Sequence, residues 1–237
     1  MSLREAWEGE ATNWSRWVRT PGHDHFAERL NIPAFVDLLP PPGRRTLDLG
    51  CGEGRLGRLL AARGHSLVGL DGSPTLAALA ERHGGYEEVR VGDAAALPFE
   101  DNAFDLVVAF MSLQDFDDLD SAVHEAARVL EPGGALALAV VHPLSSWRMA
   151  AAEVTYFERF RYAERMDRNG LSMTFHSVHL PFSDLVTALL AAGLTLEAVA
   201  EPRFRPDAAP PRPDGAEVVR RPYFLHLRGR KRHSRRE

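Results

Sequence analysis

Residues 47–54, LDLGCGEG, read as the end of a buried strand that runs into a glycine loop. Nucleotide-binding folds bring their ligand close to the backbone at such a loop. This loop also carries two carboxylates, Asp48 and Glu53. Backbone N–H groups at a helix N-terminus attract anions, so acids placed beside them would repel a pyrophosphate. The stretch therefore indicates a ligand that needs glycines and acids together.

Short apolar runs alternate with helical patterns from residue 45 onward, which is typical of repeated βα units around a parallel sheet. We expect strands at 45–50, 66–71, 86–93, 104–110, 134–141, 194–201 and 223–229. Helices are expected at 55–63, from 73 onward, at 119–130 and at 183–193. Residues 142–174 show no clear period, so we expect an insertion or lid there.

The composition indicates an ordinary globular protein with an acidic body. Of the 237 residues, 45% are hydrophobic and 26% are charged. The net charge is −5, but residues 228–237 hold six Lys or Arg and one Glu, which leaves 22 basic and 32 acidic residues elsewhere. An acidic body argues against a general nucleic-acid binder, and we expect the basic tail to be a solvated terminus.

The sequence also indicates the cellular compartment of the protein. Cys51 is the single cysteine, which excludes an internal disulfide, and the charged N-terminal residues do not fit a signal peptide. No apolar run approaches the ~20 residues that a membrane span needs. We therefore expect a cytoplasmic protein with no membrane partner and no metal site. The sequence does not specify an oligomeric state.

The acids define the ligand more closely than the glycines do. Ligands of open parallel sheets bind beyond the carboxyl ends of the strands, which places Asp48, Asp71, Asp93 and the 110–114 turn in one crevice. The glycines have G-x-G-x-G spacing, whereas the dinucleotide fingerprint is G-x-G-x-x-G. Asp48 suits a cation and Asp71 suits the two hydroxyls of a ribose. S-adenosylmethionine, a nucleoside with positive charge and no phosphate, fits this pattern.

Three stretches resemble the successive motifs of class I S-adenosylmethionine-dependent methyltransferases: LDLGCGEGRLGRLLAARGHSLVGLDGSP, GDAAALPFEDNAFDLVVAFMSLQDFDD and AARVLEPGGALALAVVHP. The resemblance covers roughly residues 44–143. It extends more weakly to residues 173–202, which are similar to small-molecule methyltransferases of the ubiquinone-biosynthesis type. It implies an α/β, Rossmann-like, doubly wound and mostly parallel sheet of seven strands, with the last strand antiparallel.

The resemblance also implies a role for each matching residue. Asp48, Gly50 and Gly52 would line the methionine moiety, and Cys51 between them is also expected at the cofactor. Asp71 would bind the ribose, with Gly72 and Ser73 beside the adenine and with Asp93 and Ala94 in contact with it. Phe110, Met111 and Ser112 would form the wall next to the sulfonium. Asp71 as a turn residue, Asp93 as a helix cap and Cys51 as a small packing residue are the alternatives. From charge and placement, Arg19 or His23 would close over the cofactor's carboxylate.

Methyl transfer is mainly a matter of alignment, but a hydroxyl or a protonated amine as acceptor would also need a base. His142 follows a strand directly and is expected at the mouth of the crevice. His176 is the second candidate and His179 the next, while Tyr156 and Gln114 could orient a substrate.

These observations predict one methyltransferase domain. We divide it into an N-terminal helical cap (1–42), a cofactor-binding core (43–142), a lid (143–175), a C-terminal helix and strands (176–228) and the basic tail (229–237). The tryptophans of the cap either cover the ligand or only anchor the cap to the core.

The aromatic-rich lid and the acidic body favour a small, partly apolar or aromatic acceptor, with O, N and C atoms all open. An RNA methyltransferase that uses the basic tail, a non-catalytic regulator that binds S-adenosylmethionine and an NAD-dependent oxidoreductase are the alternatives.

Overall fold

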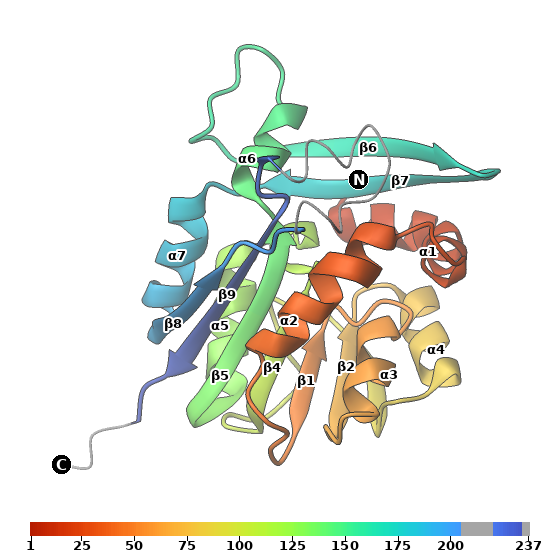
Figure 1. Ribbon diagram of the computed structural model, residues 1–237. Coiled ribbons are helices and arrows are strands. Elements are labelled where there is room, and N and C mark those ends of the chain that lie inside the picture. The colour runs from red at the N-terminus through yellow and green to blue at the C-terminus, as the bar shows by residue number, and fades with distance from the viewer. Residues whose placement is uncertain (205–219, 234–237) are drawn as a thin grey trace.

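The computed structural model describes residues 1–204 and 220–233, and its centre is a seven-stranded sheet (Figure 1). The strand order is β3-β2-β1-β4-β5-β9-β8. The strands are β1 (Thr46–Leu49), β2 (Leu67–Asp71), β3 (Glu88–Val91), β4 (Phe104–Phe110), β5 (Leu130–Val141), β8 (Leu194–Ala200) and β9 (Phe224–Lys231). The last strand, β9, runs antiparallel to both of its neighbours. This confirms the predicted sheet, whose order reverses between β1 and β4.

Helices cover both faces of the sheet. On one face, α2 (Ile32–Leu38) and α3 (Arg55–Ala61) pack through Phe35, Leu56 and Leu60 on alternate residues of β4 and β5. On the other face, α5 (Leu119–Val129) and α7 (Phe182–Ala191) contribute to the largest apolar cluster. The helix α4 (Pro74–His83) begins at Ser73, whose hydroxyl accepts from the amide of Leu76. The sheet is therefore buried on both sides, as parallel sheets require.

The N-terminal cap is helical, as predicted. Its first helix, α1 (Leu3–Arg19), begins with a capping box between Ser2 and Glu5, and the π-helical turn η1 (Ala27–Asn31) then leads into α2. The indole of Trp7 donates to the carbonyl of His176 at 2.9 Å, on a strand far away in sequence. The cap is therefore attached to the chain directly after the segment expected to be a lid.

The lid is mainly a β-hairpin, which the sequence did not predict. After α6 (Pro143–Ser146) and η3 (Trp147–Met149), the strands β6 (Phe160–Arg168) and β7 (Leu171–His179) pair in antiparallel register and lie across the top of the fold (Figure 1). The boundary proposed at residue 175 falls inside β7. The period was missed because the inward face of β6 carries Tyr162, Glu164, Met166 and Arg168, so polar residues occur on both faces of the strand.

Part of the basic tail is ordered sheet rather than solvated terminus. Both Arg228 and Arg230, on β9, pair with Glu197 on β8. The ammonium of Lys231 donates to the carbonyl of Leu130 at 2.6 Å. Residues 205–219 and the tail residues 234–237 lie outside the described residues. The start of the tail is thus occupied by contacts within the fold.

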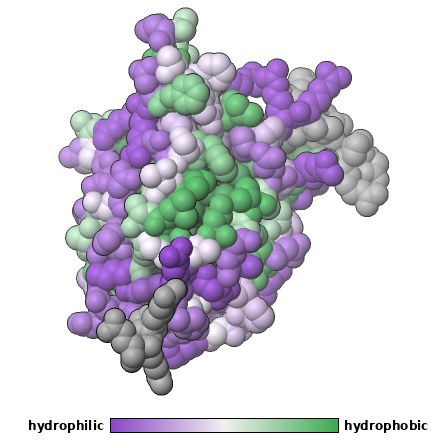
Figure 2. Space-filling view, turned by 90° about the vertical axis from the view of Figure 1, so that its left-hand side faces the viewer, coloured by the Kyte–Doolittle hydropathy of each residue, from purple (hydrophilic) through white to green (hydrophobic). Residues whose placement is uncertain are grey.

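Apolar side chains gather on the outer face formed by α7 and the edge strand β8 (Figure 2). Leu190 and Val199 are about half exposed there.

Among residues 1–204 and 220–233, no helix has both the length and the apolarity that crossing a membrane would require.

We expect the attachment of the cap to depend on Trp17. This side chain is 2% exposed and packs with Val18 and Met173, between α1 and β7. Replacing Trp17 with Ala should lower the free energy of unfolding by about 3–5 kcal/mol, because a large cavity is left between two elements. Urea denaturation measures this loss, and limited trypsin digestion should cut faster near Arg19 in the variant. A loss below ~1 kcal/mol, with unchanged digestion, would mean that α1 is held by other contacts.

Candidate active site

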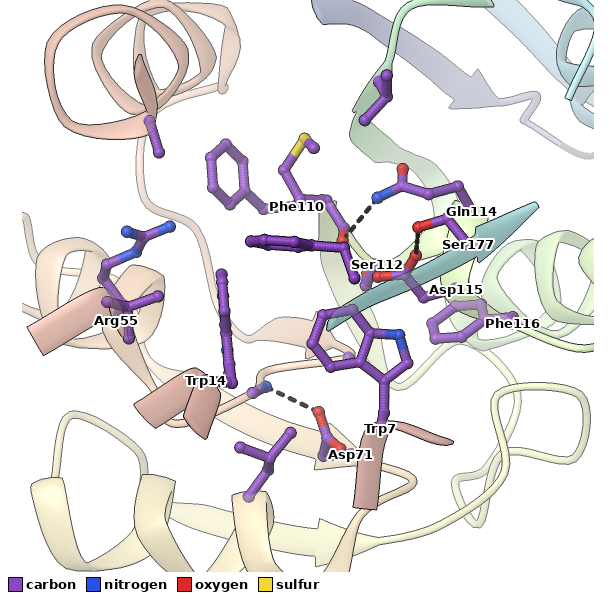
Figure 3. Close-up of a pocket in the computed structure, with 18 of the residues that line it drawn as sticks. Trp7, Trp14, Arg55, Asp71, Phe110, Ser112, Gln114, Asp115, Phe116 and Ser177 are labelled. Carbon is purple, nitrogen blue, oxygen red and sulfur yellow. Dashed lines mark hydrogen bonds between the residues drawn. The ribbon is translucent and has the colours of Figure 1, made fainter. Parts of the chain in front are cut away.

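A cavity of about 600 Å³ lies at the carboxyl ends of the central strands, between the glycine loop, α1 and the hairpin (Figure 3). This volume is within the ~300–1,000 Å³ typical of small-molecule and cofactor sites. It is the place where an open parallel sheet binds its ligands. The residues predicted to bind a cofactor line it with one exception, Arg19: the lining includes Asp48, Gly50, Cys51, Gly52, Asp71, Gly72, Ser73, Asp93, Ala94, Phe110, Met111 and Ser112.

The glycine loop takes a shape that only glycine adopts without cost. Gly50, Gly52 and Gly54 have φ values of 74°, 57° and 89°. A Cβ atom on Gly50 would lie 2.4 Å from the Cβ of Ser112, so this residue also allows a close approach between the loop and the end of β4. The loop folds back on β2, because the amides of Gly50 and Cys51 donate to the carbonyl of Leu70.

Asp48 and Asp71 end neighbouring strands and are both buried. The carboxylate of Asp71 accepts from the amides of Gly52 and Ser73, each at 2.8 Å. Burial raises the pKa of Asp71 to about 6 against these two amide bonds. Burial also raises the pKa of Asp48 to about 7, with a further rise from Asp71 and an opposing hydrogen bond from Tyr86. A cation placed between them would stabilise both ionised forms.

Glu53, the second acid of the loop, has a structural role instead. It is 1% exposed and pairs with Arg58 at 2.7 Å, with His83 at 2.9 Å and with Arg19 at 3.6 Å. Arg19 is thereby directed to Glu53 and does not line the cavity, whereas Arg55 does. The guanidinium of Arg55 lies over the ring of Trp14 and pairs with Asp24 at 2.7 Å. Arg55 was missed in the sequence because it reads as the start of an amphipathic helix.

The side of the cavity that the sequence predicts to hold a nucleoside is fixed by the cap. Arg4 donates to the carbonyl of Gly72 at 2.8 Å, and Glu8 accepts from Ser73 and from both the amide and the hydroxyl of Thr75. Asp93 accepts from the amide of Ala95 at 2.9 Å and still lines the cavity. The expected adenine contacts therefore lie on a surface that α1 supports.

The turn after β4 is strained. Met111 has a φ of 57°, which is rare for a residue with a side chain and costs on the order of 1 kcal/mol or more. Its carbonyl accepts from the side-chain amide of Gln114 at 2.9 Å, and the hydroxyl of Ser112 donates to the carbonyl of Leu49 at 2.6 Å. These bonds hold the turn against the floor of the cavity.

The histidines predicted as bases lie away from the cavity lining. The ring of His142 caps α6 by accepting from the amide of Leu144, and its other nitrogen lies 2.9 Å from Glu201. Burial lowers the pKa of His142. His176 alternates with Phe175 and Ser177, which line the cavity, so its side chain is on the opposite face of β7. His142 itself is not part of the cavity lining, although Val141 and Ser145 beside it are, and the base role of both histidines stays a prediction.

His179 and Tyr156 form a separate contact behind the hairpin. His179 is fully buried and lies 2.8 Å from the hydroxyl of Ser146 and 2.9 Å from the carbonyl of Tyr156. The hydroxyl of Tyr156 accepts from the amide of Phe182 at 3.1 Å. Gln114, in contrast, does line the cavity.

A polar group that the sequence did not predict lies opposite the glycine loop. Asp115 accepts from the hydroxyl of Ser177 at 2.6 Å, across 62 residues of sequence (Figure 3). Tyr162 pairs with Ser177 in the hairpin register and lines the same cavity. Burial raises the pKa of Asp115 well above its usual range. No group of three or more potential metal ligands occurs in the part of the chain that the structure describes.

Comparison with known proteins identifies the family. Residues 47–138 match the family described as a methyltransferase domain. The chain is 33% identical over 173 residues to the malonyl-[acyl-carrier protein] O-methyltransferase of Enterobacter lignolyticus (strain SCF1), with 68% of each chain covered. The chain belongs to the class I S-adenosylmethionine-dependent methyltransferases.

Other relatives of this methyltransferase agree. The demethylmenaquinone methyltransferase of Thermus thermophilus is 37% identical over 131 residues, which are 52% of this chain and 60% of that protein. The crystal structure of an S-adenosylmethionine-dependent methyltransferase from Mesorhizobium loti superimposes with a TM-score of 0.67 at 25% identity, covering 84% of this chain and 96% of the other.

The residues of the cavity fit the cofactor that the family uses. The two buried carboxylates match a ligand with an ammonium and a ribose, and the glycines leave the loop backbone open to it. Leu76 and Ala94 supply apolar surface on the side of Asp71 and Asp93. When bound, S-adenosylmethionine supplies a methyl group on a positively charged sulfur.

Asp48 should make the ligand-free methyltransferase less stable as pH rises. Its folded pKa is above its unfolded value, so protonation favours the folded state, and stability falls between about pH 4 and 7 and stays low above that. Asp48→Asn should therefore raise the free energy of unfolding at pH 8 by on the order of 3 kcal/mol and by almost nothing at pH 4. Denaturation of both proteins at several pH values measures the difference. A difference that does not change with pH would show that Asp48 is already ionised in the folded protein at pH 4.

Proposed function

We propose that this methyltransferase binds S-adenosylmethionine along Asp48, the glycine loop, Asp71 and Asp93, and methylates a small, partly apolar acceptor beneath the β6–β7 hairpin. The observation that carries the proposal is the cavity itself. Its floor holds the charged and glycine residues that suit the cofactor, and its roof holds Tyr162, Met166, Phe175 and Ser177. One volume thus contains two chemically different halves.

The acceptor half is amphipathic. Phe110, Met111, Phe175 and Met166 give it apolar walls, and burying a ring or chain against them contributes about 25 cal/mol per Å². The Asp115–Ser177 pair is the polar group next to those walls. This arrangement suits a molecule with an apolar body and one hydrogen-bond donor. The relative named demethylmenaquinone methyltransferase supports an acceptor with an apolar part, without choosing the accepting atom.

Asp115 is better placed than the histidines to take a proton from such an acceptor. Bound S-adenosylmethionine would supply the methyl group, and the Asp115 carboxylate would take the proton that the acceptor atom loses. Because burial raises the pKa of Asp115, its ionised form is a stronger base than an exposed carboxylate. Ser177 holds one of the two carboxylate oxygens in place.

Calorimetric titration tests the cofactor. Wild-type protein should bind S-adenosylmethionine and S-adenosylhomocysteine and not NAD. The substitution Asp71→Ala should weaken the binding of both ligands, S-adenosylmethionine and S-adenosylhomocysteine, by roughly 10- to 100-fold. It removes the expected ribose contact and leaves the amides of Gly52 and Ser73 without their acceptor. The matched control is Glu197→Ala, on the edge strand β8 and outside the cavity lining. Binding of NAD in preference to S-adenosylmethionine would refute the proposal.

Turnover tests the acceptor half. A panel of quinols, phenols, carboxylic acids and amines is offered with S-adenosylmethionine, and formation of S-adenosylhomocysteine is followed. With any acceptor that is methylated on O or N, Asp115→Asn should lower kcat by about 100-fold or more, while cofactor affinity stays the same. The rate of the wild type should rise with pH through the raised pKa of Asp115.

The histidine hypothesis is tested in the same assay. His142→Gln and His176→Ala should retain most of the activity, because neither side chain lines the cavity. Loss of turnover in either variant, with Asp115→Asn active, would transfer the base role back to that histidine.

A further inference from the structure

Tyr86 contacts Asp48 from outside the cavity. Its hydroxyl donates to the carboxylate of Asp48 at 2.7 Å, and Tyr86 itself does not line the cavity whereas Asp48 does. The residue lies between α4 and β3, in none of the stretches that resemble the family motifs. Tyr86 thus contacts the carboxylate that is proposed to bind the ammonium, and Tyr86 belongs to none of the family motifs.

Two glycines outside the glycine loop make room for the Tyr86 ring. A Cβ atom on Gly57 would lie 2.1 Å from both the ring carbon that bears the hydroxyl and the hydroxyl oxygen. On Gly69 it would lie 3.1 Å from another ring carbon. Gly57 sits within α3, where glycine costs about 1 kcal/mol relative to alanine. The helix carries this cost at a position where a side chain would displace Tyr86.

The environment of Asp48 explains why such a contact matters. Asp71 faces it from β2 and disfavours its ionised form, and the buried thiol of Cys51 adds no positive charge. Arg58, on α3, is directed to Glu53 at 2.7 Å. Among the described side chains around this carboxylate, the Tyr86 hydroxyl is the hydrogen-bond donor that the structure records.

We propose that Tyr86 is a positioning residue that favours the ionised form of Asp48 and directs it at the ammonium group of the cofactor, so that the site selects ligands which carry the amino-acid part. The inference rests on the proposed contact between Asp48 and the methionine moiety. A hydrogen bond to a charged acceptor favours the charged form, and Tyr86 donates to one carboxylate oxygen while leaving the other for the ligand.

The test compares two ligands that differ only at the amino-acid end. S-adenosylhomocysteine carries the ammonium, and 5′-methylthioadenosine has the same nucleoside and thioether without it. Tyr86→Phe should weaken the binding of S-adenosylhomocysteine by about 10-fold or more at pH 7. It should change the affinity for 5′-methylthioadenosine by less than ~2-fold. Tyr156→Phe, which removes a hydrogen-bonded hydroxyl remote from the cavity, is the matched control and should change neither.

The pH profile separates positioning from packing. In the wild type the affinity for S-adenosylhomocysteine should rise between about pH 6 and 8 as Asp48 ionises. In Tyr86→Phe this rise should move to higher pH, because one stabilising bond to the carboxylate is lost. The affinity for 5′-methylthioadenosine should stay flat in both proteins. Gly57→Ala provides a second variant, in which displacement of the ring should give the same selective loss.

Two results would overturn the inference: an unchanged affinity of Tyr86→Phe for S-adenosylhomocysteine, or an equal loss for both ligands at every pH. If the wild type itself fails to prefer S-adenosylhomocysteine over 5′-methylthioadenosine, the proposed contact of Asp48 fails instead. If the wild type has this preference and Tyr86→Phe retains it, only the role proposed for Tyr86 is refuted.

Discussion

Asp48 and Asp71 stand at the ends of two adjacent parallel strands, where both are removed from water and Asp71 opposes the ionisation of Asp48. Such a pair is unfavourable without a bound cation unless the protein donates hydrogen bonds to it. Asp71 receives two backbone amides from the loop and the next helix, and Asp48 receives the hydroxyl of Tyr86. The positive φ of the loop glycines and the missing side chain at Gly57 are conditions for those bonds.

The cap connects the two halves of the cavity. Through Arg4 and Glu8, α1 holds the loop that follows Asp71, and through Trp7 it holds the hairpin strand β7. The rings of Trp7, Trp14 and Trp17 all meet Phe175 edge to face. The tryptophans therefore anchor the cap and also border the cavity, so the two interpretations offered by the sequence are compatible.

The floor and the roof of the site come from different parts of the chain. The residues that suit the cofactor lie within or close to the family match at 47–138, and the roof comes from residues 160–177. The shape and polarity of the roof would then choose the acceptor, with Asp115 of the floor and Ser177 of the roof meeting at the boundary.

Local patterns in the sequence were enough to predict the strands of the sheet, the glycine loop and the acids around it, because these follow from periodicity and residue spacing within single βα units. The seven-stranded sheet with its antiparallel last strand followed from the resemblance to the family. The local patterns did not predict the hairpin, whose inward face lines a ligand cavity and so lacks the contrast between apolar and polar faces. They did not predict that Arg19 pairs with Glu53 or that His142 contacts Glu201, since charge and position along the chain do not fix where a side chain points. Asp115 with Ser177 and Asp48 with Tyr86 are pairs distant in sequence, and only the packing of the folded chain brings them within hydrogen-bond distance.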